Sequence, residues 1–228
     1  MSKDYKVLIF DWDGTLVNSI NRIVESVSVA AMSCGLPPLD EVAIKGIIGL
    51  GLPEAIAMLY PDVSDVKVIE AFRRAYADHY LALEVEPSSL YPGVAQSLRQ
   101  FRDYGYLLAV ATGKGRRGLD RVLEGQGWTS FFDVTRCADE TASKPDPQML
   151  HEILRHCDAR PDQALMIGDS VFDLEMARRA GMDCAAVSYG AQSTAILSAC
   201  NPDVVINHFS ELGDWLRSRS SIEVVANV

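Results

Sequence analysis

The sequence has few cysteines and no long hydrophobic run. Five cysteines are scattered over 228 residues and none belongs to a Cys-x-x-Cys pair, which argues against a disulfide framework and against a zinc site. No run approaches the ~18 apolar residues that a membrane-spanning helix needs. We therefore expect a cytoplasmic protein without a membrane partner.

Positive charge is also scarce. Twenty-one Lys and Arg residues stand against 31 Asp and Glu residues, which gives a formal net charge of −10. A chain this acidic repels the phosphate backbone of nucleic acids, so we expect no nucleic-acid partner. Hydrophobic residues make up 48% of the chain, a share typical of a globular protein and not of a disordered one.

Short apolar runs predict buried β-strands. They are continuous instead of alternating, as in a sheet that is covered on both faces. The runs are residues 7–10, 107–111, 164–167, 184–187 and 204–206, with a weaker one at 132–135. Helix-length segments separate the strands from residue 106 onward. This alternation predicts an α/β fold with a doubly wound, Rossmann-like parallel sheet.

The interval between the first two strands is too long for a single crossover helix. Apolar residues at helical spacing fill it at 17–33 and 63–83, and at 40–60 glycines and a proline interrupt the pattern. We therefore predict an inserted α-helical cap domain at 17–86. Residues 1–16 and 87–228 then form the α/β catalytic core, and the two linkers between them predict a hinge.

Polar residues follow the predicted strands, where ligands bind in open α/β sheets. They are Asp11 and Asp13, Thr112 and Gly113, Lys144, and Asp169 with Asp173. Asp11 and Asp13 are two residues apart, so both carboxylates can enter one site. A divalent cation relieves the repulsion between them, and Asp169 adds an oxygen ligand of the kind that magnesium prefers.

Each of these residues also has a purely structural interpretation. Residues 11–15 are typical of a turn, and Lys144 of a solvated loop. Thr112 and Gly113 can bind a phosphate oxygen or form a plain strand-to-helix turn. Asp173 can close a capping box with Ser170 or support the metal ligands. Four basic residues nearby favour a solvated helix face, namely Lys114, Arg116, Arg117 and Arg121.

The order of these residues resembles the four motifs of the haloacid dehalogenase superfamily. The matching residues are Asp11-Trp12-Asp13-Gly14-Thr15, Thr112, Lys144-Pro145, and Gly168-Asp169-Ser170 with Asp173. The resemblance covers nearly the whole chain and points to the phosphoglycolate-phosphatase-like branch, which has a helical cap. It implies a Mg²⁺-dependent phosphatase that hydrolyses small phosphorylated metabolites through an aspartyl-phosphate intermediate.

The resemblance also implies the role of each residue. Asp11 is the nucleophile and Asp13 the general acid and base, while Thr112, Gly113 and Lys144 bind the phosphate. Mg²⁺ is held by Asp11, by Asp169 and by the backbone carbonyl of Asp13.

Two positions depart from the family pattern, and the cap offers one candidate residue. Gly113 stands where many relatives have Asn, from which we expect a looser phosphate pocket. Asn18 stands where relatives often have Asp. In the cap, the expected substrate-facing loop at 44–49 contains Lys45, which can pair with a substrate anion or remain in solvent.

Two other functions stay open at this point. One is a sugar phosphomutase of the same superfamily, and the other is a non-catalytic, phosphate-responsive binding protein. A dehalogenase is disfavoured because a halide needs no proton donor, which leaves Asp13 without a task. The sequence leaves open which phosphorylated substrate is used and whether the protein is a monomer or a homodimer.

Overall fold

The computed structural model describes residues 4–84 and 88–219. In this part of the chain, one sheet of parallel strands has the order β3-β2-β1-β4-β5-β6. The strands are β1 (Val7–Phe10), β2 (Leu107–Thr112), β3 (Val134–Cys137), β4 (Ala164–Gly168), β5 (Asp183–Val187) and β6 (Val204–Ile206). The doubly wound parallel sheet that the sequence predicts is therefore confirmed.

The strong apolar runs agree with the strands to within one residue at each end, but the weak run does not. We expected a strand at 132–135, whereas β3 occupies Val134–Cys137. The ring of Phe132 packs edge-on against Trp12 and Trp128 instead of joining the sheet. Aromatic packing therefore shifts the start of this strand by two residues.

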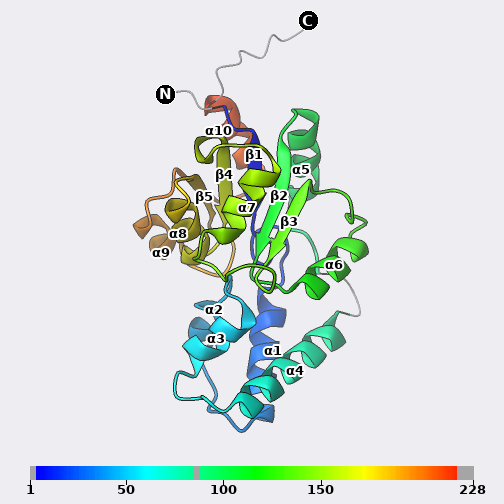
Figure 1. The fold of residues 1–228 in the computed structure, drawn as a ribbon, viewed down its shortest axis with the longest axis vertical. Helices are drawn as coiled ribbons and strands as arrows, with labels where there is room; N and C mark the ends of the chain where they lie inside the picture. The colour runs from blue at the N-terminus through cyan, green and yellow to red at the C-terminus, as the bar shows by residue number, and fades with distance from the viewer. Residues whose placement is uncertain (1–3, 85–87, 220–228) are drawn as a thin grey trace, which may run out of the picture.

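Helices cover both faces of the sheet (Figure 1). On one face lie α5 (Val94–Asp103), α6 (Arg116–Gly125) and α10 (Glu211–Arg219), and on the other α7 (Gln148–His156), α8 (Val171–Arg179) and α9 (Thr194–Ala199). A short 3₁₀ helix, Pro161–Gln163, precedes β4. Leu8 and Phe10 of β1 pack into the first layer, and Val7 and Ile9 into the second. This alternation explains why the strand is apolar at every position.

Four helices between β1 and β2 gather at one end of the sheet (Figure 1). They are α1 (Ile20–Ser33), α2 (Glu41–Lys45), α3 (Leu52–Leu59) and α4 (Val66–Leu83). We call residues 20–83 the helical cap. It has its own apolar cluster, in which Phe72 and Ile56 are at most 1% exposed.

The division into domains at 16/17 and 86/87 stays a prediction, and its second boundary lies outside the described residues. Among the residues that are described, no helix combines the length and the apolar character needed to cross a membrane.

The topology directs β1, β2 and β4 toward the cap. β1 is central and pairs with β2 on one side and with β4 on the other. The chain thus reverses its winding direction at β1, and ligands of open α/β sheets bind at such a point. The segments after these three strands carry most of the predicted site residues, and the loop after β3 adds Lys144.

Candidate active site

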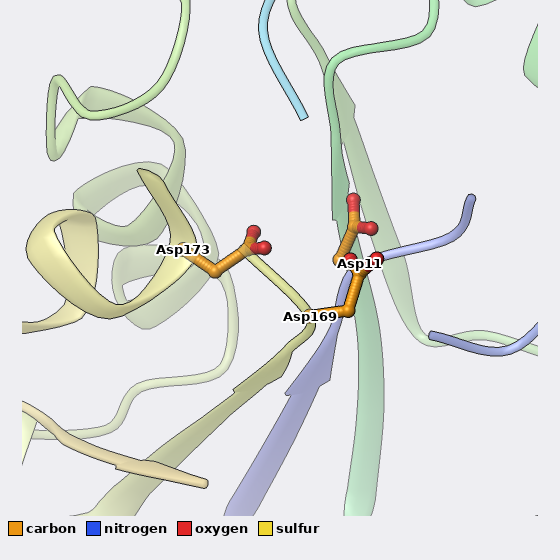
Figure 2. A group of neighbouring side chains, drawn as sticks. All are labelled: Asp11, Asp169 and Asp173. Atoms are coloured by element: carbon orange, nitrogen blue, oxygen red, sulfur yellow. The ribbon is translucent and has the colours of Figure 1, made fainter. Parts of the chain in front are cut away.

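Three buried carboxylates meet beyond the carboxyl ends of β1 and β4. Asp11 follows β1, Asp169 follows β4 and Asp173 lies in the first turn of α8 (Figure 2). One oxygen atom from each side chain lies within 4.8 Å of the others. All three residues are at most 1% exposed. Burial of several like charges needs compensation by a cation.

Lys144 supplies one positive charge to this cluster. Its Nζ lies 2.5 Å from Asp11 Oδ1 and 2.6 Å from Asp173 Oδ1. Burial acts to lower the pKa of Lys144, but the two carboxylates outweigh it and hold that pKa above its usual value. The lysine is only 1% exposed, so the alternative of a solvated loop lysine is wrong.

The cluster contains more carboxylates than positive charges even with Lys144 in place. Burial raises the pKa of Asp11 to about 7, against the opposing charge of Lys144 and with the help of Asp173. Burial, followed by the charges of Asp11 and Asp173, also raises the pKa of Asp169. Negative charge is therefore costly here, and a further cation would lower the cost.

The donor atoms fit a divalent cation. Asp11 Oδ2 is buried and has no hydrogen-bond partner among the described residues. Asp169 Oδ2 approaches the backbone so closely that a Cβ at Gly14 would lie 2.1 Å from it. Gly14 also has φ +89°, which favours glycine. Clustered carboxylate oxygens of this kind are the ligands of magnesium and calcium.

Asp13 points to different partners from Asp11. Ser19 Oγ donates a hydrogen bond of 2.6 Å to Asp13 Oδ1, and Lys114 Nζ lies 3.1 Å from Asp13 Oδ2. The carboxylate of Asp13 is not in the group formed by Asp11, Asp169 and Asp173. Metal binding through its backbone carbonyl stays a prediction. The two aspartates are thus held separately, which suits two different tasks.

Sequence reasoning missed Ser19 and assigned Lys114 to the wrong environment. Lys114 precedes α6, and its side chain is only 11% exposed because it packs over the ring of Tyr80 at 4.6 Å. Arg116 pairs with Glu140 at 2.7 Å. Of the four basic residues, Arg117 is the exposed one. The prediction of a solvated helix face is therefore wrong for Lys114.

Asp173 closes a capping box and also contacts Lys144. Its backbone N–H donates to Ser170 Oγ at 3.4 Å, and its Oδ2 accepts from the backbone N–H of Ser170 at 3.2 Å. The other oxygen, Oδ1, accepts from Lys144. The capping prediction is confirmed, and the same side chain also holds the lysine beside Asp11.

Thr112 and Gly113 lie where the cap touches the core. Thr112 ends β2 and its Oγ1 accepts a 3.1 Å hydrogen bond from the backbone N–H of Lys114. A Cβ at position 113 would lie 2.4 Å from the carbonyl oxygen of Leu50 and 2.5 Å from that of Gly49. The cap backbone thus fills the space of a side chain at 113. A looser phosphate pocket at Gly113 stays a prediction.

A cavity of about 380 Å³ lies between the cap and the core. Asp11, Asp13 and Thr112 contribute to its core side. Lys45 is not among the residues that line it. Its Nζ instead lies 2.6 Å from Glu41 Oε1 on the same helix. A role of Lys45 in substrate selection stays a prediction.

Two proteins are similar in sequence to most of this chain. The chain is 35% identical over 209 residues to a probable phosphatase, IndB, of Dickeya dadantii, which covers 90% of this chain and 91% of that protein. It is 32% identical over 219 residues to a phosphoglycolate phosphatase of Rhodospirillum rubrum, with 92% and 90% covered.

A solved structure and a family model agree with these relatives. A haloacid dehalogenase-like family hydrolase from Streptococcus pneumoniae superposes with a TM-score of 0.79 at 26% identity, over 92% of this chain and 98% of that one. Residues 8–187 match the model of the haloacid dehalogenase-like hydrolases. The match includes Asp11, Asp13, Thr112, Lys144 and Asp169. This chain belongs to the haloacid dehalogenase-like hydrolase family.

Proposed function

We propose that the protein is a Mg²⁺-dependent phosphatase that hydrolyses monoesters of small phosphorylated metabolites through an aspartyl-phosphate. The observation that carries the proposal is the state of Asp11. Its Oδ1 is held by Lys144 at 2.5 Å, while its Oδ2 is buried without a hydrogen-bond partner beside the cavity. Such an oriented carboxylate is suited to nucleophilic attack through one oxygen while the other binds a cation.

In the first step, Asp11 attacks the phosphorus atom and the bond between phosphorus and the ester oxygen breaks. Asp13 donates a proton to the departing oxygen, so that the alcohol leaves neutral. Ser19 and Lys114 contact the two oxygens of Asp13, so they hold its carboxylate after it has given up the proton. Thr112 and Lys144, at the ends of β2 and of the loop after β3, bind the oxygens of the transferred phosphoryl group.

In the second step, water attacks the phosphorus of the aspartyl-phosphate. Asp13 accepts a proton from this water, which restores the protonated carboxyl group that the first step consumed. The bond between Asp11 and phosphorus breaks, and inorganic phosphate leaves. Asp13 thus acts first as an acid and then as a base, and it ends the cycle in the protonation state in which it began.

Asp11, Asp169 and the backbone carbonyl of Asp13 are the proposed ligands of the magnesium ion. When bound, the ion supplies positive charge that offsets the repulsion between the carboxylate nucleophile and the anionic substrate. The unpartnered Asp11 Oδ2 and the raised pKa of Asp169 support a cation at this place.

Basic side chains that line the cavity favour an anionic substrate, although the chain as a whole is acidic. Lys114, Arg117 and Arg121 contribute to its lining, and so does Arg73 of the cap. Their field raises the local concentration of a phosphate ester. We also propose a cytoplasmic location, which is supported by the five cysteines, all of them free thiols.

Lys45 is proposed to contact the second anion of those substrates that carry one. This role requires the lysine to exchange Glu41, now 2.6 Å away, for the substrate. Lys45→Ala then lowers kcat/KM for a carboxylate-bearing phosphate more than for a neutral one. If Lys45→Ala leaves kcat/KM unchanged for both substrates, Lys45 has no role in substrate selection.

Trapping of the covalent intermediate tests the proposed function. The protein is mixed with Mg²⁺ and a phosphate monoester, quenched in acid and digested, and the peptide that contains Asp11 is examined by mass spectrometry. We expect that peptide to carry one phosphoryl group, which hydroxylamine removes. Turnover without any labelled peptide would favour direct attack by water, and a need for a bisphosphate activator would favour a phosphomutase.

A further inference from the structure

The cavity above Asp11 has a polar base and apolar walls. Asp11, Asp13 and Thr112 are at its base, on the core side. Most of the cap residues that line it are hydrocarbon or aromatic, among them Ile23, Val27, Ile47, Leu52, Tyr76 and Leu81. They come from α1, from the segment between α2 and α3, from α3 and from α4. Every side of the cap thus presents apolar surface to whatever is attached to the phosphate.

The charged groups in the upper part of the cavity already have partners or lie in solvent. Lys114 contacts Asp13 at 3.1 Å and the ring of Tyr80. Arg121 pairs with Glu84 at 3.2 Å. Arg117 is exposed at the rim, and Arg73 of the cap is exposed and lies 3.6 Å from Glu70. A polar substrate body therefore finds few buried groups that are free to bind it, whereas an apolar body finds a continuous wall.

The size of the cavity excludes a good fit to a very small alcohol. Its volume is about 380 Å³, whereas a cavity of roughly 150 Å³ is enough to bind benzene. A phosphoryl group takes up the polar base of the cavity, and a two-carbon acid such as glycolate leaves the space beside the apolar cap residues to water. An apolar group of ring size removes that water, which is favourable in proportion to the apolar area covered.

We infer that the preferred substrates are phosphate monoesters whose alcohol carries an apolar group about the size of an aromatic ring. This inference rests on the proposed phosphatase function and names the substrate class of the same site. Leu81 extends the apolar wall to the rim, because it lines the cavity and is 39% exposed.

A matched pair of substrates tests the inference. Ethyl phosphate and 2-phenylethyl phosphate release primary alcohols of similar reactivity, and they differ in the ring. In saturating Mg²⁺ we expect kcat/KM for the phenylethyl ester to be higher by tenfold or more, or about 1.4 kcal/mol. Equal values overturn the inference, and so does a higher kcat/KM for phosphoglycolate than for the phenylethyl ester.

A variant that narrows the cavity gives a second test. Ala77 lies on α4, lines the cavity and is exposed enough to accept a larger residue. Ala77→Phe is expected to lower the ratio of the two kcat/KM values, phenylethyl over ethyl, by about fivefold or more. Ala71→Phe is the matched control, because Ala71 is exposed on the same helix and does not line the cavity. If the ratio is the same in both variants, the ring does not bind against the cavity wall that contains Ala77, and the inference is overturned.

Binding without turnover separates this inference from the proposed function. The probes are ethylphosphonate and 2-phenylethylphosphonate, which have no ester bond, and their Kd values are measured by calorimetry with Mg²⁺ present. Tighter binding of the phenylethyl compound by tenfold or more supports the apolar subsite even if no ester is hydrolysed. Equal Kd values overturn the subsite even if every ester is hydrolysed.

Discussion

Lys144 and Asp11 form an ion pair in the interior of the protein, with 2.5 Å between Nζ and Oδ1 and at most 1% of either residue exposed. The lysine also contacts Asp173 at 2.6 Å. One cation thus ties Asp11, the proposed nucleophile at the end of β1, to the first turn of α8. The pair connects the chemistry of the site to the stability of the fold.

Lys144→Met is expected to destabilise the protein strongly. The substitution leaves Asp11 and Asp173 buried without their shared cation, and removal of one partner from a buried pair costs about 3–5 kcal/mol. The free energy of unfolding is measured by urea denaturation in chelator. Lys67→Met is the control, because Lys67 is exposed on the cap. Similar values for both variants would mean that the buried carboxylates are compensated in another way.

Asp11→Asn and Asp13→Asn are expected to fail at different steps. Asp11→Asn removes the nucleophile, so no phosphoenzyme forms. Asp13→Asn removes the proton donor, and we expect kcat to fall by about 10²–10⁴-fold for alkyl esters but much less for esters with a good leaving group. Acid-quench trapping and steady-state rates with both ester types measure this. Uniform loss for all leaving groups would exclude proton transfer by Asp13.

The stability of the metal-free protein is expected to fall as pH rises from about 4 to about 7. Burial raises the pKa of Asp11 from 3.8 to about 7, so the folded state binds this proton more tightly than the unfolded state does. The stabilisation is therefore present at low pH and is lost as pH passes the folded pKa. Thermal unfolding in chelator between about pH 5 and about pH 8 measures the loss.

Two controls assign that pH dependence. Asp11→Asn has no proton to lose at this position, so its Tm is expected to change less over the same pH range. Mg²⁺ binds the ionised carboxylates, so it is expected to raise Tm more at about pH 8 than at about pH 5. A Mg²⁺ effect that is equal at both pH values would disconnect the cation from these groups.

Gly113→Asn is expected to lower kcat/KM. A Cβ at this position would lie 2.4 Å from the carbonyl oxygen of Leu50, so the cap loop must move away from the core. Misplacement of this order costs up to ~100-fold in rate. The control is Gly213→Ala in α10, where the nearest atom to a new Cβ is 3.6 Å away. Unchanged kinetics of Gly113→Asn would show that the loop contact is dispensable.

The local sequence pattern was enough to predict the α/β fold and to place the candidate site residues after its strands. The strand at 204–206 is an unbroken apolar run that packs against both helical layers, although Val204 and Val205 at this edge of the sheet are only partly buried. The helical spacing at 63–83 likewise anticipated α4 (Val66–Leu83). Both features depend only on residues that are close in the sequence, so a short window of the sequence is enough to reveal them.

The partners of each side chain were decided by the tertiary structure. Lys144 and Asp11 are 133 positions apart, and the lysine resembles a solvated one until β1, β4 and the loop before α7 meet at one edge. Asp13, although it is two residues from Asp11, turns to Ser19 and Lys114, because the chain leaves the strand there and no longer alternates. The apolar walls of the cavity are also absent from local pattern, since they come from separate helices whose packing alone brings them above the phosphate site.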